Sequence, residues 1–162
     1  MVELSSRERL QPSLLDRLTD DAPERRRETL DQQTLSMQQL RRAVLRDLAW
    51  LLNTTNLGAV QDLTLYPEVR TSVLNYGVPD LAGKTLTMRV IQGRAREIRD
   101  AIRAFEPRMN PKRLEVEALP GFEKENAVTY VIRGDITAAV QAMPVEFKTD
   151  IEVDTASVTV RE

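Results

Sequence analysis

The sequence of 162 residues contains no cysteine and no histidine. Without cysteine there is no disulfide framework, no thiolate metal site and no cysteine nucleophile. Without histidine there is no Ser-His-Asp triad, no ordinary zinc site and no imidazole acid–base step. These absences remove much of enzyme chemistry, and we expect a chain with no metal and no cofactor.

Long apolar runs are also missing. No segment approaches the roughly 20 apolar residues of a membrane span. The first ten residues, MVELSSRERL, carry charge where a signal peptide needs an apolar stretch. We therefore expect a cytoplasmic protein without membrane insertion. Apolar residues at 41% and charged residues at 30% are typical of a soluble globular protein.

Charge is distributed unevenly, although the net charge is only −2. Residues 84–113 hold nine basic and three acidic side chains, whereas residues 114–162 hold four basic and ten acidic ones. Either the two segments attract each other within one fold, or the basic segment meets a partner. Nucleic-acid binding is an alternative, but aromatic residues make up only 4% of the chain, no known binding motif is present, and the neighbouring segment is acidic.

Residues 12–18 are expected to form a short helix. Two helical turns are not stable alone, so this helix must dock on its own domain or on another protein. Residues 24–34 have almost nothing to bury and are typical of a mobile linker, which favours a partner. We predict an arm at 1–34 and one folded domain at 35–162. The leucines that share one side of the helix are Leu10, Leu14, Leu15 and Leu18.

A long helix is predicted to begin at Ser36. Ser36 and Gln39 match a capping box, and Leu35 and Leu40 match a hydrophobic staple. The sequence NTTN at residues 53–56 is expected to end the helix. The predicted buried stripe is Met37, Leu40, Val44, Leu48 and Leu51, widened by Leu45, Trp50 and Leu52. The side chains expected in solvent are Arg41, Arg42, Arg46 and Asp47.

A second main helix is predicted over residues 91–105, where apolar residues recur at intervals of four and three. Pro107 should stop this helix at Phe105 or Glu106. If residues 106–108 are extended, Glu106 and Arg108 point the same way and form a charged fork. Alternatively, the two side chains pair with each other or with the helix end at the surface, where such pairs contribute about 0–1 kcal/mol.

After this motif, the period at which apolar residues recur changes from 3.6 to 2 residues. This change predicts antiparallel strands at residues 114–118, 128–132 and 145–153. Gly134 predicts a bulge in a long second strand that regains alternation at 136–140, with a helix at 136–143 as the weaker alternative. Residues 157–161 should form a short edge strand, on which Val158 and Val160 are candidate contacts for an added strand. The predicted fold is α+β: a docking helix and two main helices packed on a three- to four-stranded antiparallel sheet.

Several short segments of the sequence resemble those of one protein family. They are PSLLDRLTDD at 12–21, SVLNYGVPDLAG at 72–83, FEPRMNP at 105–111, VIRGDI at 131–136 and PVEF at 144–147. Their order and spacing, from about residue 10 to residue 160, resemble the TssE family, the small baseplate wedge subunit of bacterial type VI secretion systems. The wedge protein of contractile phage tails is included in that family.

This resemblance implies a structural role at the cytoplasmic side of an envelope-anchored apparatus. It implies binding to the TssF and TssG wedge subunits, and a base on which the contractile TssB–TssC sheath begins. The family's Glu-Pro-Arg motif maps onto Glu106, Pro107 and Arg108. Together with the docking leucines Leu14, Leu15 and Leu18, these residues are the candidate partner contacts.

Because members of this family have carried a lysozyme-like label, glycoside hydrolysis is the enzyme alternative. It needs two suitably spaced carboxyls, one of them kept protonated in an apolar pocket. Glu106 is the candidate acid, but Arg103 and Arg108 are close in sequence and favour its charged form. We therefore predict no catalytic residue. The acids expected on a solvent-facing sheet surface are Glu115, Glu117, Glu146, Asp150, Glu152 and Asp154.

Overall fold

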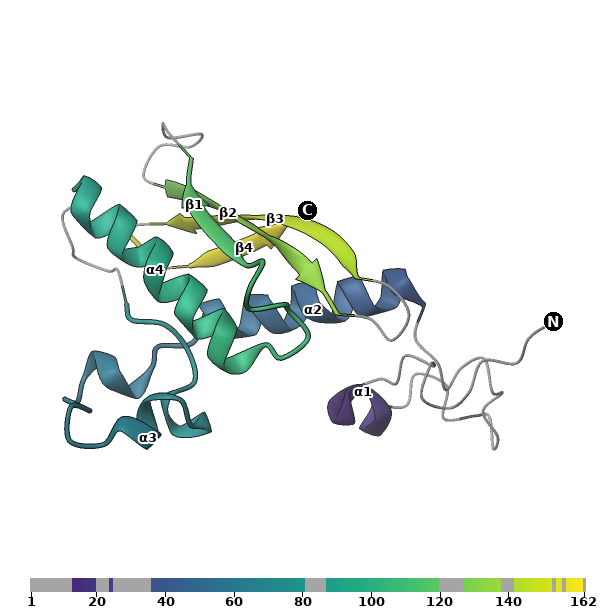
Figure 1. Ribbon diagram of the computed structural model, residues 1–162, viewed down its shortest axis with the longest axis horizontal. Helices are drawn as coiled ribbons and strands as arrows, with labels where there is room; N and C mark the ends of the chain where they lie inside the picture. The colour runs from purple at the N-terminus through teal and green to yellow at the C-terminus, as the bar shows by residue number, and fades with distance from the viewer. Residues whose placement is uncertain are drawn as a thin grey trace.

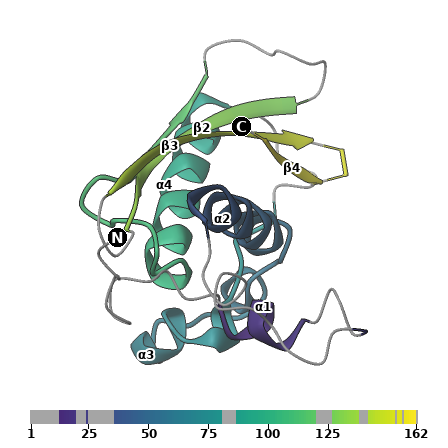
Figure 2. The same cartoon turned by 90° about the vertical axis from the view of Figure 1, so that its right-hand side faces the viewer.

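The computed structural model describes residues 13–19, 24, 36–80, 87–119, 127–137, 142–152, 154–155 and 157–161. Two layers make up the fold: a four-stranded antiparallel sheet, and two long helices, α2 (Met37–Leu52) and α4 (Met88–Phe105), that lie on one of its faces (Figure 1). The short helices α1 (Leu14–Leu18) and α3 (Pro67–Arg70) lie at the end of the molecule opposite the sheet (Figure 2). The predicted α+β class is confirmed.

The start of α2 follows the predicted capping box. The Gln39 N–H donates to the Ser36 hydroxyl at 3.2 Å, and the Ser36 N–H donates to the Gln39 side chain at 2.8 Å. The helix ends at Leu52, with Asn53 as C-cap, as the NTTN sequence predicted. Two apolar residues depart from the predicted stripe: Met37 is 37% and Trp50 49% exposed. The predicted staple residue Leu35 lies outside the described residues.

The connector between the long helices is a set of tight turns. It contains η1 (Leu57–Ala59), α3 and η2 (Val73–Asn75). Gly77 has φ +117°, a conformation that L side chains rarely adopt. A Cβ there would lie 2.2 Å from the Thr54 carbonyl oxygen. The Val78 N–H donates to that same oxygen at 2.8 Å, which ties the connector to the end of α2.

Helix α4 begins earlier than its predicted apolar stripe. The Val90 N–H donates to the Thr87 hydroxyl at 3.3 Å, so Thr87 is the N-cap. The helix ends at Phe105, as Pro107 predicted. Ala95, Ile98 and Ile102 are buried against the sheet.

The strands follow one another in space as they do in sequence: β1 (Glu115–Ala118), β2 (Ala127–Ile136), β3 (Met143–Glu152) and β4 (Val158–Arg161). The predicted bulge at Gly134 is wrong, because β2 and β3 pair in one unbroken register with Gly134 opposite Val145. The glycine serves close packing instead, since a Cβ there would lie 2.9 Å from the Met109 methyl group. β2 ends at Ile136; residues 138–140, which were predicted to continue it, lie outside the described residues.

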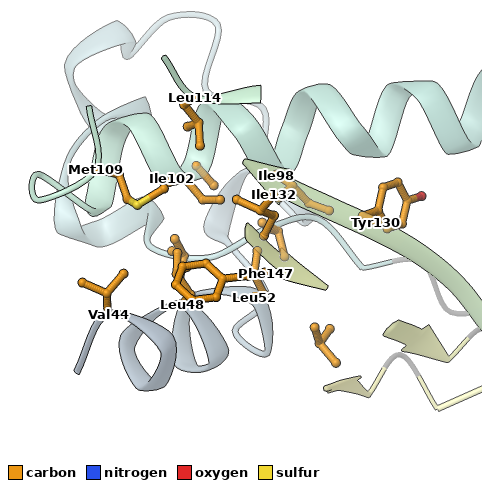
Figure 3. Packing of buried hydrophobic residues seen from close by; sticks show 14 of the residues in the cluster. Val44, Leu48, Leu52, Ile98, Ile102, Met109, Leu114, Tyr130, Ile132 and Phe147 are labelled. Atoms are coloured by element: carbon orange, nitrogen blue, oxygen red, sulfur yellow. The ribbon is translucent and has the colours of Figure 1, made fainter. Parts of the chain in front are cut away.

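The core lies between the helices and the sheet (Figure 3). Leu48 and Leu52 of α2 lie close to Phe147 of β3, and Ile98 and Ile102 of α4 lie on the β2 side. The largest fully buried side chains, including Tyr130 of β2, come from both the sheet and the helices. This packing holds the end of α4 next to the middle of α2.

On the outer face of the sheet, charged side chains pair across strands. Arg133 Nη1 lies 3.1 Å from a Glu117 oxygen, and its Nε lies 2.8 Å from Glu146. The prediction that Asp150 faces solvent is wrong: it is 3% exposed, accepts from the Thr129 hydroxyl at 2.8 Å and lies 3.1 Å from Arg161. A carboxylate in the middle of a sheet is covered by its cross-strand neighbours, which alternation alone does not reveal.

Candidate functional site

The segment after α4 folds back as a turn. The Met109 N–H donates to the Glu106 carbonyl at 3.1 Å, which closes a four-residue turn with Pro107 at its second position. Proline suits that position because its ring fixes the φ that the turn requires. The expected extended stalk at residues 106–108 is therefore wrong. The turn is anchored further along, where Asn110 N–H and Thr137 N–H bonds join it to the end of β2.

Glu106 and Arg108 pair with each other across this turn, which was the alternative interpretation of the motif. Arg108 Nε donates to Glu106 Oε1 at 2.7 Å, and Nη2 donates to Oε2 at 2.5 Å. Glu106 is only 4% exposed, so the pair is not a surface pair. A bidentate arginine–carboxylate pair of this kind is stronger and more directional than a solvated one.

Asp47 of α2 joins this pair although it lies 61 residues away in sequence. Its Oδ2 accepts from Arg108 Nη2 at 2.5 Å, and its Oδ1 accepts from Arg46 Nε at 2.8 Å. Arg46 Nη1 in turn donates to Asp16 of α1 at 2.6 Å. We call the five residues Glu106, Arg108, Asp47, Arg46 and Asp16 the ion-pair chain. It connects the end of α4, the polar side of α2 and the N-terminal helix.

The expectation that the polar side of α2 is solvated is therefore wrong in part. Arg42 is exposed, whereas Arg41, Arg46 and Asp47 are half-buried. The turn after α4 lies against this side of α2 through Arg108, and α1 lies against it through Asp16. Helical period shows which side of α2 is polar, but not which other segment meets it.

Hydrogen bonds and charges within the ion-pair chain shift the pKa values of Arg108 and Asp16. Burial alone would lower the pKa of the Arg108 guanidinium, but the hydrogen bonds and charges of Glu106 and Asp47 outweigh it and raise that pKa. The hydrogen bond from Arg46 lowers the pKa of the Asp16 carboxyl, against a smaller opposing effect of burial. Burial, followed by the charges of Asp47 and Glu106, raises the pKa of the Tyr76 phenol.

A hollow of about 380 Å³ lies beside the ion-pair chain, between α1, α2 and the end of α4. The Tyr76 and Phe105 rings meet edge to face at a centroid distance of 5.3 Å, and the Arg46 guanidinium lies 4.8 Å from the centre of the Trp50 ring. The hollow is thus apolar with a charged wall. Its apolar lining consists of Leu15, Trp50, Leu51, Tyr76, Phe105 and Pro107.

The leucines of α1 lie mostly in solvent. Leu14 is 71% and Leu18 75% exposed, while Leu15 is 48% exposed and lines the hollow. The helix is capped by Ser13, whose hydroxyl accepts from the Asp16 N–H at 3.3 Å. Its hydrogen bond to α2 therefore runs through Asp16, and its leucine side keeps a large apolar surface. Leu10 lies outside the described residues.

Strand β4 is the edge of the described sheet, as predicted. The side chain of Val158 is 6% exposed and belongs to the core, and that of Val160 packs against the core. Both side chains therefore point to the helical layer. Contacts of this edge with another strand would have to use the backbone of Val158 and Val160 rather than their side chains.

The described carboxylates do not assemble a hydrolytic pair around Glu106, because Arg108 occupies both of its oxygens. Among the described residues, no group of three or more acidic side chains is placed to hold a metal ion. A larger and more open hollow of about 590 Å³, lined by residues such as Lys112, Arg133 and Glu146, lies over paired charges on the sheet. It joins none of the predicted site residues.

Some of the arginines of α4 are buried or lie close to an acidic side chain. Arg94 is 3% exposed, and its Nη1 donates to the Pro79 carbonyl. Burial lowers the pKa of the Arg94 guanidinium. Arg99 and Arg103 lie 3.5 and 3.9 Å from Asp100. The helix therefore does not present a continuous row of unpaired arginines.

Three residues of the ion-pair chain were missed from sequence. Asp16, Arg46 and Asp47 are ordinary charged residues on amphipathic helices, and Arg46 and Asp47 were expected in solvent. Asp47 and Arg108 could have been linked by their positions only if the end of α4 were already known to cross α2. No local signal carries that information.

No helix in the described part of the chain is long and apolar enough to cross a membrane. No curated protein matches the chain. The family described as baseplate wedge protein gp25 matches residues 38–144, which include α2, the connector, α4 with the Glu106–Arg108 turn, and the sheet through the start of β3. The chain belongs to this baseplate wedge family, to which TssE and the phage protein gp25 also belong.

Proposed function

We propose that this chain is the TssE-type wedge component of a bacterial type VI secretion baseplate. In that role it binds the TssF and TssG subunits at the cytoplasmic side of the envelope and provides the base for the TssB–TssC sheath. Membership of the baseplate wedge family supports a structural, non-enzymatic component of a phage-like contractile system. The assignment to a type VI secretion system rests on the resemblance of the sequence segments around Glu106, Pro107 and Arg108.

The observation that carries the proposal is the ion-pair chain. A motif of three residues is anchored to α2 through Asp47 and to α1 through Arg46, so the surface around it has a fixed shape. Pro107 is exposed and Arg108 is partly exposed, with 24% of its side chain accessible. A partner can therefore contact the outer side of the turn without breaking the buried pair, which suits a permanent joint in an assembly.

The second proposed contact is α1. Its exposed Leu14 and Leu18 give an apolar side that a five-residue helix cannot bury by itself. An amphipathic helix of this kind fits a groove formed by helices of another subunit. Leu15 would remain on the hollow or move with the helix, depending on whether Asp16 keeps its bond to Arg46.

Co-purification from the native host, followed by mass spectrometry, tests the proposal. Tagged wild-type protein should recover TssF and TssG, and Arg108→Ala should recover less of both. Arg103→Ala is a matched control, because this exposed arginine of α4 lies 3.9 Å from Asp100 and outside the ion-pair chain. Recovery of nucleic acid or of no baseplate subunit by the wild-type protein would contradict the proposed function.

A further inference from the structure

The backbone of β4 alternates between two directions. The Glu152 N–H donates to the Ser157 carbonyl at 3.0 Å, which makes these residues a hydrogen-bonded pair. Bonded and non-bonded pairs alternate along an antiparallel ladder. The pairs of Ile151 with Val158 and of Thr149 with Val160 are therefore non-bonded. It follows that the N–H and C=O groups of Val158 and Val160 point away from β3, toward the edge.

A side chain from the helical layer forms hydrogen bonds with the outward-pointing N–H and C=O groups of Val158. The Val158 N–H donates to Asn53 Oδ1 at 3.0 Å, and Asn53 Nδ2 donates to the Val158 carbonyl at 2.8 Å. One primary amide thus forms the same two bonds that a residue of a neighbouring strand would form. Nδ2 also donates to the Ala49 carbonyl at 2.7 Å, which fixes the amide to the last turn of α2.

We propose that Asn53 is an edge plug: it occupies the position of a partner residue opposite Val158, and an extended strand of another subunit docks on β4 only by replacing it. The inference deepens the proposed role in starting the sheath and rests on that role for the identity of the partner strand. Its physical content concerns the isolated chain. No hydrogen bond to another described residue engages the outward groups of Val160, so these groups would receive the first bonds of the added strand.

Two features of Asn53 suit a plug that can be removed. Open strand edges bind other copies of the same chain, and native proteins protect them. The plug covers one of the two outward-pointing residues of a four-residue strand. Asn53 itself is exposed, so water can replace its bonds when a strand displaces it. The edge is therefore protected in the single molecule and still available to a strand that offers more than two bonds.

Self-association of the full chain tests the plug, with a second copy of β4 as the probe strand. Asn53→Ala should increase the concentration-dependent dimer fraction seen by analytical ultracentrifugation, with a dimer affinity about tenfold above wild type, as expected from uncovering two hydrogen-bonding groups. Asn56→Ala is the matched control, because Asn56 lies at the same helix end and its side-chain oxygen makes no hydrogen bond. It should behave as wild type does.

The double variant Asn53→Ala/Val160→Pro identifies the surface that associates. Proline removes the outward N–H of Val160 and is tolerated on an edge strand, so it should return the dimer fraction to that of wild type. If Asn53→Ala keeps a cooperative melt and associates no more than wild type, the inference is wrong. Association that persists in the double variant also contradicts it, because the contact then lies elsewhere.

Amide hydrogen exchange of the wild-type chain gives a second measurement that no folding defect can obscure. The Val158 amide should exchange at least about tenfold more slowly than the Val160 amide, since only the Val158 N–H donates a hydrogen bond to Asn53. Equal exchange of the two amides would overturn the plug. Both measurements use the isolated chain, so they stand or fail separately from the recovery of TssF and TssG.

Discussion

Gly77 holds one of the tightest backbone contacts in the described chain. Its φ of +117° and the 2.2 Å that would separate a Cβ from the Thr54 carbonyl oxygen leave no room for a side chain. The close approach lets Val78 pair with Thr54 at the end of α2. The turn around Gly77 thus joins the connector to the end of α2.

Gly77→Ala should lower the free energy of unfolding by at least about 1–3 kcal/mol, because the new methyl group meets backbone and the φ is unfavourable. Gly93→Ala on α4 is the matched control. Apart from its chain neighbours and the backbone of its own helix, no atom lies within 4 Å of its added Cβ, so alanine should stabilise the helix by about 0.5–1 kcal/mol. Urea unfolding measures both, and a neutral Gly77→Ala would contradict the argument.

Arg108 is the residue on which binding and stability meet. Arg108→Ala should destabilise the fold by about 1–3 kcal/mol, because it leaves the buried Glu106 carboxylate without its main donor. Arg108→Lys keeps the charge but loses the planar fork, so it should weaken recovery of TssF and TssG nearly as much as alanine does. Thermal melts and pull-downs separate the two effects.

The contribution of the pair itself requires a double-mutant cycle. Glu106→Gln together with Arg108→Gln should cost less than the sum of the two single changes, because the single changes each leave one unmatched partner. Additive costs would mean that the two side chains are not coupled. Full binding by Arg108→Lys would show that the fork does not serve recognition.

At the scale of elements, an ion pair between Asp16 and Arg46 joins α1 to α2. The pair of Asp16 with Arg46 is partly exposed, and such pairs contribute about 0–1 kcal/mol. The Asp16 pKa is lowered in the docked state, so its contribution is present above the unfolded pKa of about 3.9 and is lost as pH falls through the docked pKa. Attachment of α1 should therefore weaken in acid, and not in mild alkali.

Asp16→Asn should release α1 at neutral pH and remove this acid dependence. Hydrogen exchange over residues 13–19 measures the release, and it should become faster while the amides of α4 stay protected. Asp62→Asn is a suitable control, because Asp62 accepts hydrogen bonds from Thr64 in the exposed connector. Unchanged exchange in α1 would show that its leucines, rather than Asp16, hold it.

The elements themselves were largely predictable, and their contacts were not. Period and capping residues identified α2, α4 and the strands, because those signals lie within a few neighbouring positions. Trp50 was placed in the core by the same period, yet it lies at the edge of the stripe beside Arg46, where a ring can cover a guanidinium. Asp47, Asn53 and Asp150 took unexpected roles because their partners come from other elements.

For the whole molecule, the core lies within residues 40–158, and the described part of the arm adds nothing to it. Deleting residues 1–34 should therefore change the melting temperature by no more than about 4 °C, since the lost ion pair is worth about 1 kcal/mol at most. Calorimetry of the truncated chain measures this. A much lower melting temperature or insolubility would mean that α1 belongs to the folded domain, and the predicted boundary at residue 34 would be wrong.

Stability should also depend on alkaline pH. Burial raises the pKa of Tyr130 to about 12, above the value of about 10 in an unfolded chain. The raised pKa gives a contribution that is fully present below pH 10 and is lost as pH rises toward 12. The urea concentration at the unfolding midpoint should decrease as pH rises from 10 to 12. The midpoint of Tyr130→Phe should decrease less steeply over the same range. Equal slopes for the two proteins would contradict the assignment.

The bond between Asn53 and Val158 spans 105 residues and has a consequence for protein synthesis. Helix α2 leaves the ribosome long before β4, and at about 5–20 residues per second the interval is about 5–20 s. During that time the apolar stripe of α2 has no complete sheet to cover it. The nascent chain should therefore be a client of ribosome-bound chaperones until β4 emerges and closes against the end of α2.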